Sequence, residues 1–146
     1  MKFSIGCDHG GFDYKNKLID YLKEKEHEVI DCGTTSLDSC HYPEFAIKTA
    51  EMVKNGIVDR GIVVCRSGEG VSIAANKVKG VRCALAYNTI VARLCREHND
   101  ANMIAFGADY FTIEEVKAML DEFIKAEFAK GNHEIRVEMI KSYENK

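Results

Sequence analysis

Short apolar runs alternate with longer stretches of helical periodicity along most of the chain, and this alternation restricts the fold more than any other feature. Apolar residues recur at helical spacing over residues 11–26 and 43–55, and again over 70–78 and 88–98. The run RGIVVC is apolar almost throughout, as in a strand that helices cover on both faces. The other predicted strands are KFSIGC, HEVIDCG, RCALAY and NMIAFG. Right-handed crossovers between such strands give a parallel sheet, so we predict an α/β fold that is three-layered (α/β/α) and Rossmann-like, with a five-stranded parallel sheet.

The C-terminal part of the chain is predicted to be helical. Thr112 and Glu115 form a capping box that opens a long helix, and Gly131 is expected to end it. A last helix is expected from His133 to about Tyr143, and because no strand follows, we expect it to pack on a neighbouring surface or a partner chain. The 146 residues match the usual size of one domain, so a single domain over residues 1–146 is predicted.

Charge and cysteine usage exclude several classes of function. The net charge of −3, with basic residues scattered among acids, provides no field for a phosphate backbone, so we expect no nucleic-acid partner. The first apolar run is too short for a signal peptide or a membrane span, so we expect a cytoplasmic protein that contacts no membrane. The six cysteines are expected to be free thiols, and the lack of CxxC and HExxH patterns argues against a metal site.

The loop after the third strand is the main candidate for a site, because open parallel sheets bind ligands at the carboxyl ends of their strands. It reads CRSGEG, residues 65–70, and leads into a helix. Amides in such a loop bind anions, and a thiol beside a helix N-terminus has its thiolate form favoured. A cysteine phosphatase would need an arginine six positions after the cysteine, where Val71 stands, and no complete nucleotide-binding glycine pattern is present.

This loop therefore fits a small-molecule enzyme in which Cys65 acts as a base and loop amides stabilise an oxyanion. Asp8 and His9 follow the first strand, and we expect them at the same edge as His98 and Asn99, which end the fourth helix. A thiolate, two imidazoles and a set of amides suit proton transfer on a polyol. A non-catalytic nucleotide or flavin binder is the alternative that the fold alone allows.

Six segments of the chain occur in an order and at a spacing that match a known protein family: GCDHGGFDYK, HEVIDCGT, YPEFA, CRSGEGVSIAANKV, GVRCAL and ARLCREHNDANMIAFGA. In this arrangement the sequence resembles the ribose-5-phosphate isomerase B family, which includes the galactose-6-phosphate isomerase subunits, over about residues 1–140. The resemblance implies an aldose–ketose isomerase without metal or other cofactor that interconverts ribose 5-phosphate and ribulose 5-phosphate through a cis-enediolate. It also implies a homodimer with each site between two subunits.

The resemblance assigns roles to individual residues. Cys65 is the base, Ser67 moves a proton to and from the sugar oxygens, and the amides from about Ser67 to Gly70 form the anion hole. His98, with Asp8 nearby, opens the furanose ring. Because each site of the family lies between two subunits, the resemblance implies that His98 and the C-terminal segment serve the Cys65 of a partner chain. The expected substrate-binding residues are His9, Tyr42, Arg66, Gly68, Glu69, Gly70, Asn99 and Arg136.

The chain also departs from the family pattern. Arg66 and Glu69 stand in the loop where the family has glycine and isoleucine, and Asp109 and Asn132 stand where it has phosphate-binding arginines. Two hypotheses follow: Arg66 supplies a replacement cation, or the substrate is a different or unphosphorylated sugar. A catalytically silent sugar-binding relative is the third alternative.

Overall fold

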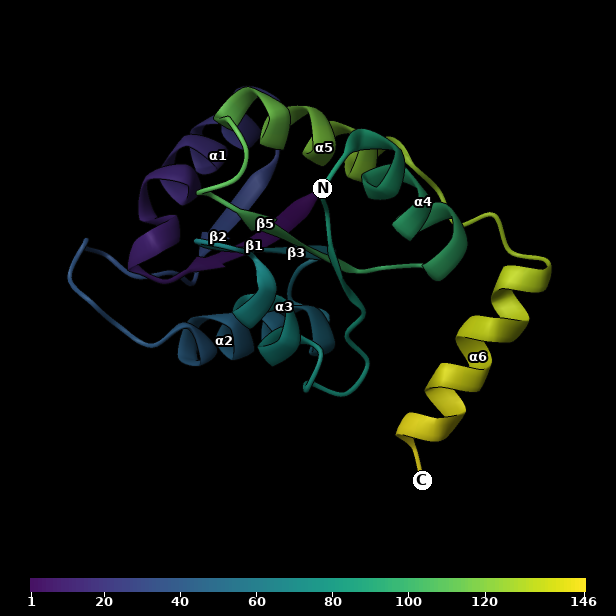
Figure 1. Ribbon diagram of the computed structural model, residues 1–146. Helices are drawn as coiled ribbons and strands as arrows, with labels where there is room; N and C mark the ends of the chain where they lie inside the picture. The colour runs from purple at the N-terminus through teal and green to yellow at the C-terminus, as the bar shows by residue number, and fades with distance from the viewer.

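Five parallel strands form one sheet in the order β2-β1-β3-β5-β4 in the computed structural model, which describes residues 1–146 (Figure 1). Cys7 pairs with Val64 and Cys65 pairs with Gly107, so the three central strands end at nearly the same level. The five-stranded parallel sheet predicted from the sequence is confirmed. The strands are β1 (Lys2–Cys7), β2 (Glu28–Asp31), β3 (Arg60–Cys65), β4 (Cys83–Leu85) and β5 (Met103–Gly107).

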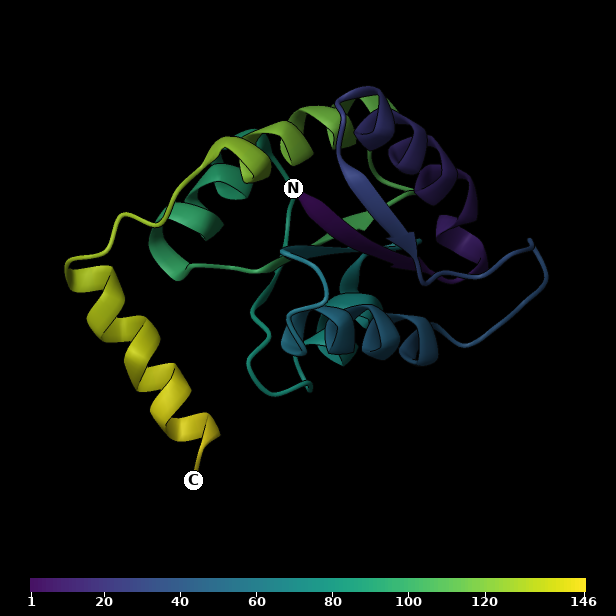
Figure 2. The ribbon, with the colours of Figure 1, turned by 180° about the vertical axis from the view of Figure 1, so that it is seen from behind.

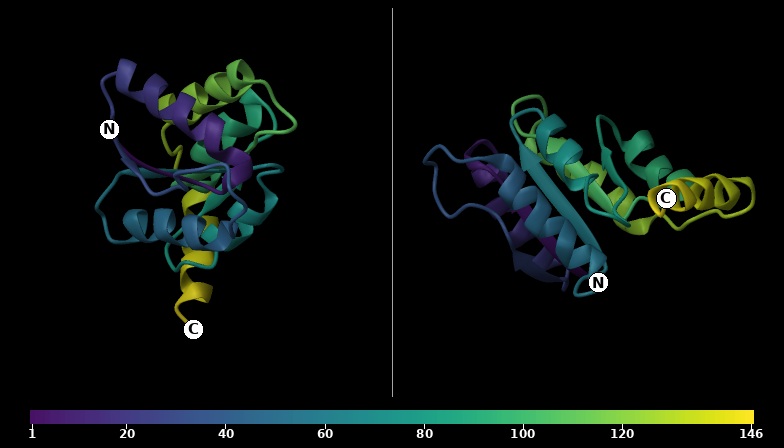
Figure 3. Two further views of the ribbon diagram at one scale, coloured as in Figure 1. Left: turned by 90° about the vertical axis from the view of Figure 1, so that its left-hand side faces the viewer. Right: turned by 90° about the horizontal axis from the view of Figure 1, so that it is seen from below.

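Two layers of helices cover the sheet, as Figure 1 and the left view of Figure 3 show. One layer holds α1 (Phe12–Glu24), preceded by the 3-10 turn η1 (His9–Gly11), with α4 (Thr89–Asn99) and α5 (Ile113–Lys125). The other layer holds α2 (Tyr42–Lys54) and α3 (Glu69–Ala75). Along β3, Ile62 and Val64 pack into the first layer while Val63 and Cys65 pack into the second. The apolar run of β3 is continuous because both faces of this strand are buried.

The helix α5 ends earlier than the sequence predicts. Its last residue is Lys125, and Gly131, which was expected to stop it, instead precedes α6 (Asn132–Glu144) with a φ of 60°. Ala126 is already extended, and the amide of Ala129 donates a hydrogen bond to the carbonyl of Glu97 at 3.0 Å. This contact with the end of α4 replaces the helical hydrogen bonding that the local sequence favours.

The helix α6 projects away from the three layers (Figures 1 and 2). Val137 is its only buried residue, whereas four large apolar side chains along it are exposed: Ile135, Met139, Ile140 and Tyr143. A helix with this much exposed apolar surface lacks a covering neighbour within the chain. No helix in the protein has the length and apolar character that a membrane span requires.

Candidate active site

Cys65 ends β3 at the carboxyl edge of the sheet, with its side chain in the layer of α2 and α3 and only 5% exposed. The amide of Gly68 donates a hydrogen bond to Sγ of Cys65 at 3.1 Å. Gly68 has a φ of +81°, and a Cβ there would lie 2.7 Å from Leu85 and 2.9 Å from the carbonyl carbon of Phe106. Glycine at this position therefore lets the loop turn back over β5 and direct its amide at the sulfur.

The loop amides are divided between local contacts and free positions. The amide of Glu69 donates to Oγ of Ser67 at 3.2 Å, and the amide of Gly68 is bonded to the thiol. The amides of Ser67, Gly70 and Val71 have no acceptor within the chain. Of the four amides expected to form the anion hole, those of Gly68 and Glu69 are thus bonded within the loop itself, and those of Ser67 and Gly70 are free, with the amide of Val71 beside them.

Asp8 and His9 lie at the same edge, where β1 ends. Oδ1 of Asp8 accepts hydrogen bonds from the amides of Gly10 at 2.9 Å and Gly11 at 3.3 Å, so this buried carboxylate is held in a fixed position. Nδ1 of His9 accepts a hydrogen bond from the amide of Cys40 at 3.3 Å. A neutral ring nitrogen at that position leaves the opposite nitrogen of His9 free for another partner.

Tyr42 and Arg66 close this edge from two sides. A Cβ at Gly70 would lie 2.7 Å from the Tyr42 ring, and one at Gly10 would lie 2.5 Å from Cγ of Arg66. Tyr42 therefore packs on the start of α3, while Arg66 packs against the turn that follows β1. The structure brings together eight of the expected site residues at the carboxyl edge: Asp8, His9, Tyr42, Cys65, Arg66, Ser67, Gly68 and Gly70, with Glu69 beside them on the loop.

Arg66 forms an ion pair with Asp109, with Nη1 and Oδ2 at 3.6 Å. The backbones of these two residues are also linked, since the amide of Asp109 donates to the carbonyl of Arg66 at 3.0 Å. The two side chains are 64% and 45% exposed, so water screens their attraction. Asp109 thus points to the rim of the site, where its charge offsets that of Arg66.

His98 and Asn99 lie at the opposite edge of the sheet, so the expectation that they share one edge with Cys65 in the same chain is wrong. The crossover helix α4 runs back toward the start of β5, and the amide of Asn102, just beyond it, bonds to the carbonyl of Arg82 before β4. Between the level of Met103 and that of Cys65 there are four residues of strand, or about 13 Å. His98 and Cys65 of one chain are thus too far apart to act on one small molecule.

A second cluster surrounds His98 at this amino edge. Its ring stacks on that of His133 from α6, with centroids 4.2 Å apart and planes 10° apart. Burial, then the neighbouring charges of His98 and Arg136, lower the pKa of His133. His133 was not assigned to the site from the sequence. Its place three residues before Arg136, on one face of a helix, is the sequence signal that links it to that expected site residue.

Beside this cluster lies a cavity of about 680 Å³ between the amino edge of the sheet and α6, and it is lined in part by Asn99, Arg82, Ile140 and Tyr143. Nowhere in the protein do three His, Cys, Asp or Glu side chains come together as metal ligands. The chain therefore carries two separate groups of polar residues, one at each edge of the sheet.

Comparison with known proteins identifies the family. The family model described as Ribose/Galactose Isomerase matches residues 3–140. Ribose-5-phosphate isomerase B of Escherichia coli is 41% identical over 145 residues, which cover 99% of this chain and 97% of the relative. The structure of ribose-5-phosphate isomerase B from Clostridium thermocellum has a TM-score of 0.98 and 48% identity, over 99% of this chain and 98% of that one. The Mycoplasma genitalium enzyme, solved with bound ribulose-5-phosphate, has a TM-score of 0.95 and 38% identity, over 99% and 97% of the two chains.

These matches extend over nearly the whole chain and agree in sequence and in structure. They confirm the resemblance drawn from the segments around Cys65 and His98. The chain is an isomerase and belongs to the ribose/galactose isomerase family.

Proposed function

We propose that the protein is an aldose–ketose isomerase for a sugar phosphate, interconverting ribose 5-phosphate and ribulose 5-phosphate, with Cys65 as the base. The observation that carries this proposal is the thiol of Cys65 at the edge of the sheet, fixed by the Gly68 amide and flanked by free loop amides. The relatives named ribose-5-phosphate isomerase B, and the bound ribulose-5-phosphate in one of their structures, support the choice of substrate. The free cysteines of the chain suit the reducing cytosol, where we place the reaction.

The reaction follows from these positions. The thiolate of Cys65 removes the proton from C2 of the open-chain aldose, and the electron pair forms the C1–C2 double bond while O1 takes the negative charge. The free amides of Ser67, Gly70 and Val71 stabilise this enediolate. The hydroxyl of Ser67 passes a proton from O2 to O1, and the thiol of Cys65, whose proton exchanges with solvent, protonates C1 to give the ketose. No group is gained or lost, and no external oxidant or reductant is needed.

Ring opening requires a second chain in this proposal. Since His98 and Asn99 lie at the amino edge, we place the partner's His98 and the partner's Asn99 over Cys65 in a homodimer with two equivalent sites. The partner's His98 and the fixed carboxylate of Asp8 move the proton that opens the furanose, and the partner's Asn99 bonds sugar hydroxyls. The exposed apolar side chains of α6 support a surface that a second copy covers.

The phosphate end is assigned to His9, Arg66 and Arg136, the last from the partner. The ion pair with Asp109 partly neutralises the charge of Arg66. A neutralised Arg66 attracts a phosphate less than a free one would, so this pair favours the alternative of a different or unphosphorylated sugar. Because both side chains are exposed, a phosphate can compete with Asp109 for Arg66. We therefore keep ribose 5-phosphate as the proposed substrate, with the free sugar as the alternative.

Proton NMR in D₂O tests the proposal, using ribose 5-phosphate and, separately, free ribose and allose. We expect ribulose 5-phosphate to form with deuterium at its C1 and, through the reverse reaction, deuterium to enter C2 of the aldose, and Cys65→Ala to abolish both. The matched control is Cys83→Ala, which removes another buried thiol from the same face of the sheet; burial raises the pKa of Cys83 to about 12, so it remains protonated. Exchange with a free sugar alone would mean that the substrate is that sugar and not ribose 5-phosphate. No exchange with any sugar would favour a catalytically silent binding protein.

A further inference from the structure

The turn that carries His98 and Asn99 ends in an unusual backbone conformation. Asp100 is the C-cap of α4 and has φ 47° and ψ 43°, in the left-handed region that favours glycine. Helices often end with glycine in this conformation because it has no side chain to clash. Aspartate is one of the few other residues that adopt this conformation, and unlike glycine it brings a carboxylate to the turn.

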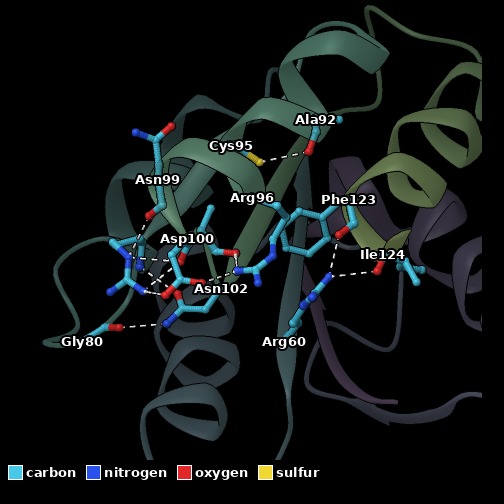
Figure 4. Close-up of polar contacts among 12 residues, drawn as sticks. Arg60, Gly80, Ala92, Cys95, Arg96, Asn99, Asp100, Asn102, Phe123 and Ile124 are labelled. Carbon is cyan, nitrogen blue, oxygen red and sulfur yellow. Dashed lines mark hydrogen bonds and ion pairs between the residues drawn. The ribbon is translucent and has the colours of Figure 1, made fainter. Parts of the chain in front are cut away.

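Both carboxylate oxygens of Asp100 bind arginine, as Figure 4 shows. Oδ1 accepts a hydrogen bond from Nη1 of Arg96 at 2.8 Å, and Oδ2 accepts one from Nη2 of Arg82 at 3.0 Å. The side chains of Arg82 and Arg96 are 17% and 11% exposed, so these ion pairs are shielded far better than the one between Arg66 and Asp109. Charge-assisted bonds of this kind fix geometry as well as contribute energy.

The same two arginines also hold the backbone of the turn. Nε of Arg82 donates to the carbonyl of Asn99 at 3.1 Å, and its Nη2 donates to the carbonyl of Asp100 at 2.8 Å. Nη1 of Arg96 donates to the carbonyl of Ala101 at 2.7 Å. In Figure 4 the carbonyl of Asn99 faces this cluster, whereas its side-chain amide points away from it. The carbonyls of three consecutive residues, starting at Asn99, are thus fixed from one side.

The carboxylate of Asp100 also offsets the positive charges of several neighbouring arginines. Arg60, on β3, donates to the carbonyls of Phe123 and Ile124 beside the cluster. Burial, followed by the charge of Arg96, lowers the pKa of Arg60 to about 10, and the carboxylate of Asp100 acts in the opposite direction. Nε of Arg96 is buried and has no hydrogen-bond partner, so one donor of this side chain is unsatisfied. Without the carboxylate, the arginines would repel one another and lose a shared acceptor.

We propose that Asp100 is a positioning residue, whose carboxylate, held between Arg82 and Arg96, fixes the last turn of α4 so that His98 and Asn99 face the partner's site. This inference rests on the proposed function, since it assigns His98 to ring opening in the neighbouring subunit. It predicts that the negative charge of Asp100, and not merely its backbone conformation, is needed for the ring-opening step.

Two reactions of the same protein separate ring opening from the chemistry at Cys65. Ribose 5-phosphate is a furanose that must open, whereas ribulose 5-phosphate has its C5 oxygen blocked by phosphate and remains open-chain. Exchange of the C1 protons of ribulose 5-phosphate with D₂O therefore needs Cys65 but no ring opening. At saturating substrate, this exchange reports on proton abstraction alone.

The variants are Asp100→Asn, which keeps a residue that tolerates the left-handed region but removes the charge, and Asp100→Gly, which keeps the backbone turn without a side chain. We expect both to lower kcat for ribose 5-phosphate by about tenfold to a hundredfold, with the exchange rate of ribulose 5-phosphate within about twofold of the parent. The control is Arg93→Gln, which breaks the exposed ion pair with Glu97 on the same helix and should change neither rate.

Other outcomes would overturn the inference. If Asp100→Gly opens ribose 5-phosphate at the parent's rate, the backbone turn is sufficient and the carboxylate has no positioning role. If folded Asp100→Asn loses both reactions equally, the residue supports the structure as a whole. If the unsubstituted protein performs neither reaction, the proposed function fails, and this inference fails with it.

Discussion

Replacement of Gly68 by alanine should destabilise the protein and disturb Cys65 at the same time. The backbone φ of +81° disfavours any Cβ, by about 1–2 kcal/mol. The added Cβ would also lie 2.7 Å from Cδ1 of Leu85, 2.9 Å from the carbonyl carbon of Phe106 and 3.0 Å from the amide nitrogen of Gly107. Two of these atoms belong to the backbone of the central sheet, so the loop has to move, at a further cost of about 1–3 kcal/mol. The expected loss is about 2–5 kcal/mol of the free energy of unfolding.

Gly80 provides a matched control for this variant. Its φ is +88°, but a Cβ there would meet nothing within 4 Å, so Gly80→Ala should show the backbone penalty alone. Equilibrium unfolding in urea at one protein concentration measures both losses, and turnover measured well below the melting temperature reports on the Gly68 amide that binds Cys65. Equal losses of stability for the two variants, or unchanged turnover in Gly68→Ala, would refute this account of the loop.

Three further predictions concern charge. Burial, and then nearby positive charge, lower the pKa of His133, so the folded chain binds a proton less readily than the unfolded chain, which accepts one near pH 6.5. The free energy of unfolding should therefore fall as the pH decreases below about 6.5. Urea titrations should show a smaller fall in His133→Gln. The buried ammonium of Lys15 donates to Asp31 at 2.7 Å, so Lys15→Met should lower the free energy of unfolding by about 1–3 kcal/mol, and an unchanged urea midpoint would contradict this. Asp109→Asn should release Arg66 and lower KM for ribose 5-phosphate about two- to fivefold, without changing KM for free ribose; equal changes for both sugars would exclude a phosphate contact by Arg66.

The spacing of apolar residues predicted the strands and helices well, because burial on the two sides of a sheet leaves a strong pattern of apolar residues in the sequence. The continuous apolar run of β3 and the capping box at Thr112 were both found where the sequence placed them. The end of α5 was predicted wrongly because AEFAKG is compatible with a helix. Only the tertiary bond from Ala129 to Glu97 shows why the chain leaves the helix at Ala126.

The site was predicted in part. The residues that directly follow β1 and β3 meet at one edge, as the topology of parallel sheets requires. The expectation from the residues alone that His98 lies at the edge of Cys65 was wrong because the motif that contains it gives no direction for the helix relative to the strands. The family resemblance had placed His98 with a partner's Cys65. The pairing of Arg66 with Asp109 and the stacking of His98 on His133 join residues far apart in the sequence, so no local pattern records them.

The most direct test of the two-chain site is complementation between two inactive variants. Cys65→Ala and His98→Asn should each have almost no turnover of ribose 5-phosphate alone. When the two chains are unfolded together and refolded as a mixture, half of the dimers carry one of each chain. One of the two sites in such a dimer then has both Cys65 and the partner's His98 intact. The account predicts recovery of about a quarter of the unsubstituted activity. A mixture as inactive as its components, despite confirmed mixed dimers, would contradict a site that is shared between two subunits.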